Sequence, residues 1–292
     1  MKKNIIVVTG GAGFIGSHLI ENLLKFKRFN IISVDDYSSG SKKNHINNKR
    51  VKYFKFDTKE IEKKLSKYKN KIQSIFHFGE FSRIYQSFLK FEDCFNSNIV
   101  GSNAVFNFCL KNNIKLIYSA TSATLGNNGN DKNLSPYAFS KAKNLELLEN
   151  LKKWFNLKIE IIYFYNVYGP RQISHGEMAT VIGIFENQYN NNKPLTVVKP
   201  GTQTRRFTYI DDTIFTCINA WRLNKNKHYA ITSRQSHSII QVAKLFKSKI
   251  KYLPKRKGER FASALIDMNL SNKVLKSYGR YKVKDYVESI VK

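Results

Sequence analysis

The chain has 292 residues, of which 42% are hydrophobic, and a formal net charge of +29 at pH 7. This length suffices for one large core or for a domain with a smaller lobe, and the hydrophobic content excludes a wholly disordered protein. No apolar run approaches the roughly 18 residues of a membrane-spanning helix. Because the first residues lead directly into a strand pattern rather than a signal peptide, we expect a cytoplasmic protein with no membrane partner.

The positive charge comes from 50 lysines and arginines against 21 aspartates and glutamates. An excess of this size is typical of proteins that bind nucleic acid. However, the cations are scattered over the whole chain, and Asn and Ile are also used heavily. We therefore interpret the charge as a compositional bias of the genome and expect no nucleic-acid partner, although the positive field would attract an anionic substrate.

Cysteine and histidine give no sign of a metal or disulfide site. The three cysteines, Cys94, Cys109 and Cys217, lie far apart and form no CxxC pair. The six histidines lack the spacing of metal ligands. We expect buried free thiols and no metal.

Strand and helix patterns alternate in the first part of the chain. Such a rhythm predicts an α/β fold, a Rossmann-type doubly wound parallel sheet with helices on both faces. The expected strands are 4–10, 30–36, 51–57, 71–79, 114–120 and 157–167, and the expected helices are about 13–27, 91–112 and 135–155.

The rhythm loosens after about residue 170. We expect a helix over 177–191, a strand, turn and strand over 194–212, short helices over 211–223 and 238–248, and a basic loop over 253–260. No Pro-rich or Ser-rich linker interrupts the chain. We therefore expect a Rossmann domain over 1–170 and a smaller C-terminal α/β lobe over 171–292 packed against it.

The first strand is followed by a glycine-rich turn with Gly10, Gly13 and Gly16. Glycines between a strand and a helix allow a tight turn and a close approach of a pyrophosphate to the helix N-terminus. Asp35 ends the second strand about 20 residues later, where a carboxylate accepts hydrogen bonds from an adenosine ribose and repels a 2′-phosphate. This pattern favours NAD over NADP. Asp57 ends the third strand and could reach the adenine, or could simply be a solvated acid.

Tyr137 and Lys141 are four residues apart in the long helix predicted over 135–155. This spacing brings both side chains to one face of the helix. A phenol has a pKa near 10, and a neighbouring ammonium together with a nicotinamide cation favours its ionised form. Thr121 and Ser122, at the end of the preceding strand, could hydrogen-bond a substrate oxygen or could merely cap the next turn.

Taken together, these segments resemble the NAD-dependent nucleotide-sugar epimerase/dehydratase family of the extended short-chain dehydrogenase/reductase superfamily, which includes UDP-glucose 4-epimerases. Their order and spacing carry the likeness. The matching segments are "TGGAGFIGSHL", "VDD", "FD", "FHFGEFSRI", "NIVGSNAVFNFC", "YSATSATLG", "SPYAFSK", "YFYNVYGPRQ", "TRRFTYIDD" and "KGER".

The resemblance implies a role for each matching residue. Tyr137 would be the catalytic base and acid, Lys141 its partner and Thr121 the third member of the site. The implied NAD contacts are Gly10, Gly13, Phe14, Ile15, Gly16, Asp35, Asp36, Asp57, Phe78, Gly79 and Lys141. The implied contacts of the nucleotide sugar, held mainly by the second lobe, are Ser122, Arg83, Asn166, Arg205 and Arg256.

Two acids that this chain lacks narrow the choice among the reactions of the family. Dehydratases of the family carry an Asp–Glu pair directly after the Thr, and here Ser122 and Ala123 stand there. The resemblance therefore implies a 4-epimerase, in which bound NAD takes a hydride from C4 and returns it to the opposite face. Glu80 and Arg83 replace small or apolar residues of many relatives, so UDP-glucose, UDP-N-acetylglucosamine and a uronic acid all stay open.

Two other functions are weighed against this one. A one-way 4-ketoreductase or sugar dehydrogenase of the same fold would release its cofactor in each turnover. A non-catalytic RNA-binding protein on this fold is a more distant alternative, since Tyr137, Lys141 and Thr121 are all present. We expect a homodimer through the helices at 91–112 and 135–155, whose apolar stripes could otherwise pack on the sheet.

Overall fold

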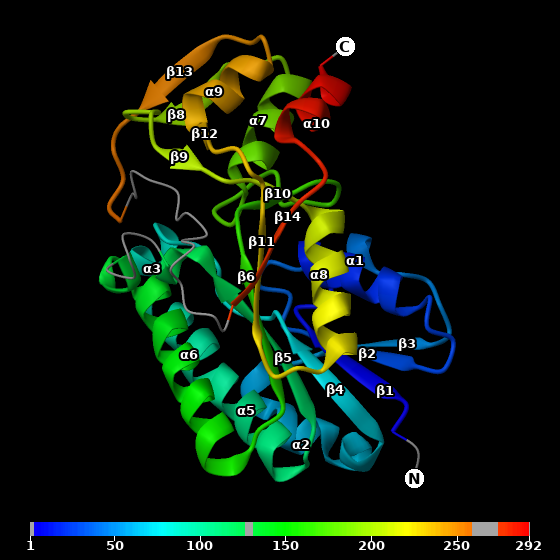
Figure 1. Cartoon of the computed structure of the whole chain (residues 1–292). Coiled ribbons are helices and arrows are strands. Elements are labelled where there is room, and N and C mark those ends of the chain that lie inside the picture. Colours follow the sequence, from blue (N-terminus) through cyan, green and yellow to red (C-terminus); the bar gives the residue numbers. More distant parts are fainter. Residues whose placement is uncertain (1–2, 126–130, 259–273, 292) are drawn as a thin grey trace.

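A computed structural model describes residues 3–125, 131–258 and 274–291. Its centre is an eight-stranded sheet in the order β14-β11-β6-β5-β4-β1-β2-β3, in which all neighbouring strands are parallel (Figure 1). The strands are β1 (Ile5–Thr9), β2 (Asn30–Asp35), β3 (Val51–Lys55), β4 (Ile72–His77), β5 (Lys115–Thr121), β6 (Ile159–Phe164), β11 (His228–Thr232) and β14 (Val274–Tyr278). The Rossmann-type parallel sheet predicted from the sequence is confirmed.

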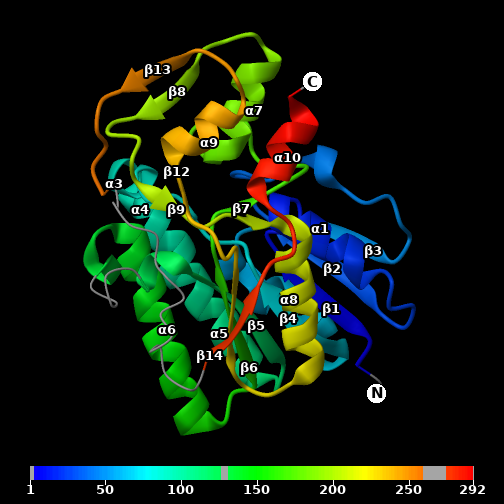
Figure 2. The ribbon, with the colours of Figure 1, turned by 45° about the horizontal axis from the view of Figure 1, so that its top comes forward.

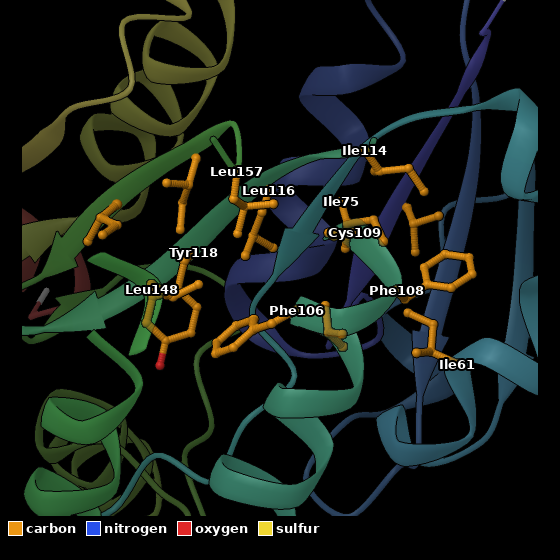
Figure 3. Packing of buried hydrophobic residues seen from close by; sticks show 14 of the residues in the cluster. Ile61, Ile75, Phe106, Phe108, Cys109, Ile114, Leu116, Tyr118, Leu148 and Leu157 are labelled. Atoms are coloured by element: carbon orange, nitrogen blue, oxygen red, sulfur yellow. The ribbon is translucent and has the colours of Figure 1, made fainter. Parts of the chain in front are cut away.

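Helices cover both faces of this sheet. On one face lie α2 (Ile61–Leu65), α5 (Ser102–Lys111) and α6 (Pro136–Phe155), and on the other lie α1 (Phe14–Leu23) and α8 (Ile210–Leu223) (Figure 1). The apolar strand residues pack against the first set of helices in a large cluster that includes Phe106, Leu116 and Tyr118 (Figure 3). This core fixes the carboxyl ends of the strands, where the loops that carry chemistry begin.

The sequence pattern explains why α6 begins and ends where it does. Ser135 is its N-cap and accepts a hydrogen bond from the backbone of Ala138 at 3.1 Å. Pro136 occupies the first helical position, where its missing N–H costs nothing, and Asn156 ends the helix in a left-handed conformation. These signals place Tyr137 and Lys141 on the first two turns of a well-defined helix.

The helix predicted over 91–112 is interrupted. The structure has α4 (Phe91–Phe95), a π-helical turn over 96–101 and then α5. The turn brings Asn98 inward, where its side chain exchanges hydrogen bonds with the backbone N–H and C=O of Phe81 at 2.7 and 3.0 Å. A polar side chain tying a helix to the loop after β4 is the physical reason for the departure from a regular helix.

The C-terminal lobe is built from short elements (Figure 2). It contains α7 (Val181–Asn190), α9 (Ile239–Leu245) and α10 (Val283–Ile290) around a core of its own. Its strands pair as β8 (Leu195–Val198) with β13 (Ile250–Leu253), β9 (Thr204–Arg205) with β12 (His237–Ser238), and β10 (Thr208–Tyr209) with β7 (Val167–Tyr168). A further short helix, α3 (Gln86–Leu89), lies between β4 and α4.

The strands after residue 170 differ from the sequence-based prediction in two ways. The segment 194–212 is not a hairpin, because β8, β9 and β10 each pair with a different distant strand. In addition, β11 and β14 join the main sheet although they follow residue 170 in the chain. The division at residue 170 itself stays a prediction, and the last two residues of the predicted basic loop 253–260 lie outside the described residues.

Within the described ranges, none of the helices is long and apolar enough to cross a membrane.

Candidate active site

A cavity of about 820 Å³ lies between the carboxyl ends of the sheet strands and the C-terminal lobe. This volume is typical of a site for a small molecule or cofactor. Every residue predicted from the sequence for the site lines this one cavity. They are Gly10, Gly13, Phe14, Ile15, Gly16, Asp35, Asp36, Asp57, Phe78, Gly79, Arg83, Thr121, Ser122, Tyr137, Lys141, Asn166, Arg205 and Arg256.

The glycine-rich turn leaves no room for side chains. Gly10 has φ of +70°, and a Cβ added to it would lie 2.8 Å from the backbone nitrogen of Gly79. A Cβ on Gly16 would lie 2.1 Å from the carbonyl oxygen of Gly10. Helix α1 begins at this turn without a side-chain cap, and its first residues Phe14 and Ile15 line the cavity. Uncapped amides and a helix dipole at a closely packed turn fit the pyrophosphate of NAD.

Three carboxylates follow β2 and β3 at the cavity. Asp35 is buried, and its two oxygens accept hydrogen bonds from the backbone of Ala12 at 2.9 Å and of Tyr37 at 2.8 Å. Burial raises the pKa of Asp35 above its usual value. Asp36 accepts from the backbone of Ser38 at 2.8 Å, and Asp57 caps the 3₁₀ turn that follows β3. Each carboxylate is thus held in place, while its contact with the adenosine stays a prediction.

Tyr137 and Lys141 lie one helical turn apart at the cavity wall, and both are buried. The ammonium of Lys141 donates hydrogen bonds to the carboxylate of Glu80 and to the carbonyl oxygen of Ser119. It also lies 4.4 Å from the centre of the Tyr118 ring. Burial lowers the pKa of Lys141, although the carboxylate of Glu80 opposes that effect.

Glu80 is the centre of a buried polar cluster. One of its oxygens accepts from the hydroxyl of Ser102 at 2.8 Å, from the hydroxyl of Tyr118 at 3.0 Å and from the amide of Asn144 at 3.3 Å. Burial alone would raise the pKa of this carboxyl, but Lys141 and the surrounding donors lower it. Glu80 is therefore an ionised carboxylate that forms a buried ion pair with Lys141.

His77, at the end of β4, connects this cluster to the glycine-rich turn. Its Nδ1 lies 2.7 Å from the hydroxyl of Thr9, and its Nε2 lies 2.9 Å from the hydroxyl of Ser102. Burial lowers the pKa of His77 to about 4, so its imidazole is neutral at pH 7. The hydroxyl of Thr9 also accepts from the backbone N–H groups of Phe78 and Gly79 at 3.1 and 3.0 Å.

The structure separates the two neighbouring arginines of "TRRFTYIDD". Arg205 is buried and lines the cavity, and it donates a hydrogen bond to the carbonyl of Thr204 at 2.8 Å. Arg206 donates instead to the carbonyl of Ser233 at 2.7 Å. Asn166 has φ of +38°, and its amide donates to the carbonyl of Arg206 at 3.0 Å. Of these two arginines, Arg205 lines the cavity and Arg206 does not.

Two further cations reach the cavity from other elements. Arg83 follows β4 and donates to the carbonyl of Ser82 at 2.9 Å and to that of Met178, which precedes α7. Burial lowers the pKa of Arg83. Arg256 follows β13 and lies 5.3 Å from the ring of Tyr85. Both arginines line the cavity near its junction with the second lobe.

Thr121 ends β5 and has a local structural task as well. Its hydroxyl oxygen accepts a hydrogen bond from the backbone of Ala123 at 3.2 Å and caps the 3₁₀ turn over 122–124. Thr121 nevertheless lines the cavity. The two residues after Thr121 bring no carboxylate into the cavity.

The ion pair between Glu80 and Lys141 was not predicted from the sequence. The signal for it was an acid directly after an apolar strand, in "FHFGEF", where burial is expected and an acid needs a cationic partner. In the described ranges, no group of three His, Cys, Asp or Glu side chains could hold a metal ion.

Comparisons with known proteins agree with this geometry. The model of the NAD-dependent epimerase/dehydratase family matches residues 6–232. An uncharacterised UDP-glucose epimerase of Bacillus subtilis is 31% identical over 72% of this chain and 70% of its own length. An ADP-L-glycero-D-manno-heptose-6-epimerase of Brachyspira hyodysenteriae is 29% identical over 83% of this chain and 80% of its own length.

A solved structure gives the same picture. A UDP-glucuronic acid 4-epimerase from Bacillus cereus, in complex with UDP-glucuronic acid and NAD, superimposes with a TM-score of 0.85. It is 27% identical, and the match covers 98% of both chains. The chain therefore belongs to the NAD-dependent epimerase/dehydratase family, as a nucleotide-sugar enzyme whose cofactor is NAD.

Proposed function

We propose that this protein is a nucleotide-sugar 4-epimerase that acts on a UDP-sugar and keeps its NAD bound through the reaction. The observation that carries this proposal is the composition of the cavity wall around Tyr137. The wall contains Tyr137, Lys141 and Thr121, while Ser122 and Ala123 stand where a dehydratase needs its extra acids. A bare Tyr–Lys–Thr site can move one proton and orient one hydroxyl, which is what epimerisation at C4 requires.

The residues then have distinct tasks. Tyr137, as the phenolate, takes the proton of the C4 hydroxyl and returns it at the end of the reaction. Lys141 stabilises the phenolate and binds the nicotinamide ribose, and Thr121 hydrogen-bonds the C4 oxygen. The chemistry that bound NAD would supply at C4 is reversible hydride transfer, with return to the opposite face of the sugar, so that no cofactor would be consumed.

Binding of the two ligands is divided between the two parts of the chain. The uncapped start of α1 holds the pyrophosphate of NAD, Asp35 and Asp36 the ribose, and Asp57 the adenine. Arg205 and Arg256 bind the diphosphate of the nucleotide sugar, since a guanidinium fork matches phosphate oxygens. Asn166 and Ser122 complete the contacts of the substrate. The positive charges of the two arginines suit the diphosphate of a UDP-sugar, and UDP-sugars are named for two of the relatives.

We also propose a homodimer through the helical segment from α4 to α5, which includes the π-helical turn over 96–101, and through α6. Phe91, Val100 and Phe139 expose 54%, 50% and 37% of their surface on this face. The rings of Phe91, Phe95 and Phe139 form a continuous stack. A second copy would remove these apolar groups from water. Sedimentation should give a dimer for the native chain and a monomer for Val100→Lys, and a native monomer would refute the interface.

The cytoplasmic location of the protein stays a prediction.

The test is a proton NMR assay without added cofactor. Purified protein is incubated with UDP-, GDP-, ADP- and dTDP-sugars, and the signals that report the configuration at C4 are followed. The proposal requires interconversion of one UDP-sugar with its C4 epimer. The matched control is Tyr137→Phe, which keeps the ring and should lower kcat at least about 1,000-fold with NAD still bound.

Three outcomes would contradict the proposal. Turnover only after NAD(P)H or NAD is supplied would indicate the one-way oxidoreductase. Near-normal epimerisation by Tyr137→Phe would remove Tyr137 from the chemistry. RNA that elutes with the protein and is released by salt, without any turnover, would favour the non-catalytic alternative.

A further inference from the structure

The buried acid beside the catalytic lysine is the feature that the proposed function does not use. Glu80 and Lys141 expose 3% and 4% of their side chains, and their charged groups are in direct contact. A simple Tyr–Lys pair needs no such acid, and a buried carboxylate is costly to keep unless it has partners. Here the partners of Glu80 come from three separate elements, α5, β5 and α6.

Proton positions in the cluster follow from its acceptors. The carboxylate of Glu80 has no proton to give, so the hydroxyl of Ser102 must donate to it. The oxygen of Ser102 then accepts from Nε2–H of neutral His77, and Nδ1 of His77 accepts from the hydroxyl of Thr9. One tautomer of His77 therefore satisfies every bond, and all donors in the chain point towards Glu80.

This chain of bonds connects both ligand-facing parts of the cofactor site. Thr9 lies at the end of β1, directly before Gly10, and its hydroxyl accepts the backbone N–H of Gly79. Lys141 lies at the opposite end of the chain, beside Tyr137. The position of Lys141 is thus fixed through Glu80 to the turn that the sequence predicts for NAD.

Resting on the proposed function, we propose that Glu80 is a positioning residue that holds the ammonium of Lys141 beside Tyr137 and offsets its charge, so that the oxidised form of bound NAD is favoured over NADH. The physical reason is the charge of the nicotinamide. Oxidised NAD carries a positive ring, whereas the ring of NADH is neutral. A lone ammonium in a buried site would repel the cation, and the adjacent carboxylate cancels that repulsion.

The same balance affects Tyr137. The lysine charge stabilises the phenolate, and the carboxylate reduces this stabilisation. The other groups that face the pair have little charge to contribute. His77 on β4, Tyr118 on β5 and Cys94 on α4 are neutral at pH 7, because burial lowers the pKa of His77 and raises those of Tyr118 and Cys94. Arg83, on the loop after β4, is a further cation whose charge acts on Tyr137.

The experiment is a charge cycle on the holoenzyme. Each variant is incubated with fixed mixtures of NAD and NADH, and the bound forms are quantified after rapid gel filtration. Glu80→Gln leaves a net positive pair and should lower the preference for NAD over NADH about tenfold. Lys141→Met leaves a net negative pair and should raise it by a similar factor. The double variant Glu80→Gln/Lys141→Met is neutral again and should resemble the native protein.

A pH profile adds a second readout. In Glu80→Gln the acidic limb of kcat should move about one pH unit lower, because the phenolate is then stabilised by an unopposed ammonium. Glu149→Gln is the matched control and should change neither measurement. Glu149 is an acid elsewhere on α6 that pairs with His228 of β11. If Glu80→Gln does not fold, Lys141→Met and the neutral double variant still differ only in the charge of residue 80, and comparing them isolates that charge.

Two results would overturn the proposal. Equal NAD-to-NADH preference in all folded variants would mean that Glu80 is only structural. A shift that persists in the double variant would mean that the effect does not come from charge. Because the cofactor measurement needs no substrate, it stands even if the 4-epimerase assignment fails.

Discussion

The two halves of the cavity are built in different ways. The cofactor half consists of loops after β1, β2 and β4, where glycines bring backbone against backbone and one buried chain of side chains joins the loops. The substrate half consists of short strands and arginines from a lobe whose pairings link distant segments. The difference suits the proposed reaction, in which NAD stays bound and the nucleotide sugar leaves. We therefore expect steric changes at the glycine-rich turn to weaken the binding of the cofactor, and the loss of a charge at Arg205 to weaken the binding of the substrate.

The largest expected effect concerns the glycine-rich turn. Gly16→Ala should lower the affinity for NAD more than about 100-fold and reduce stability by about 1–3 kcal/mol, because its Cβ would lie 2.1 Å from the carbonyl oxygen of Gly10. Gly13→Ala introduces a milder contact in the same turn, since its Cβ would lie 3.1 Å from the same atom, and should cost less stability. Bound NAD measured by absorbance, and unfolding in urea, test both variants. Equal effects would show that packing at Gly16 is not special.

The next effect is a pH dependence of stability from His77. Its pKa is lowered from 6.5 to about 4 in the folded state, so the unfolded chain binds a proton first as the pH falls. The free energy of unfolding should therefore drop by about 3 kcal/mol between pH 6.5 and pH 4 through this group alone. His77→Gln cannot titrate and should lose this part of the slope. Urea unfolding at several pH values measures it, and parallel curves would contradict the prediction.

The smallest effect tests the substrate half through two neighbouring arginines. Arg205→Met should raise KM for the nucleotide sugar about 10- to 100-fold with NAD binding unchanged, because it removes a charged phosphate contact. Arg206→Met should change KM less than about threefold, since Arg206 bonds the carbonyl of Ser233 and does not line the cavity. Steady-state kinetics on both variants decide this. A larger effect at Arg206 would reverse the assignment of the two residues.

The cofactor half could be predicted from the sequence because its signals are local. The turn with Gly10, Gly13 and Gly16 lies between a strand and a helix that are adjacent in the chain. Tyr137 and Lys141 share one helix, so their spacing alone brings them together. Even the start of α6 follows from a capping serine and a proline.

The rest depends on contacts between distant segments. The partner of β9 is β12, more than thirty residues later, and no local pattern encodes that pairing. The π-helical turn over 96–101 depends on Asn98 meeting Phe81, which a helical periodicity cannot reveal. Likewise, "HFGEF" predicts a buried acid, but only the fold brings Lys141 to it.

The order of strands in the main sheet has a consequence for synthesis of the protein. Strand β14 forms one edge of the sheet, yet it follows the strands and helices α7 and α9 of the second lobe in the chain. Until residue 278 has left the ribosome, β11 can pair with β6 on one side, but its other edge lacks the partner β14. An exposed edge strand is prone to pair with other chains. A nascent chain stalled after β13 and before β14 would therefore be the form most in need of a chaperone.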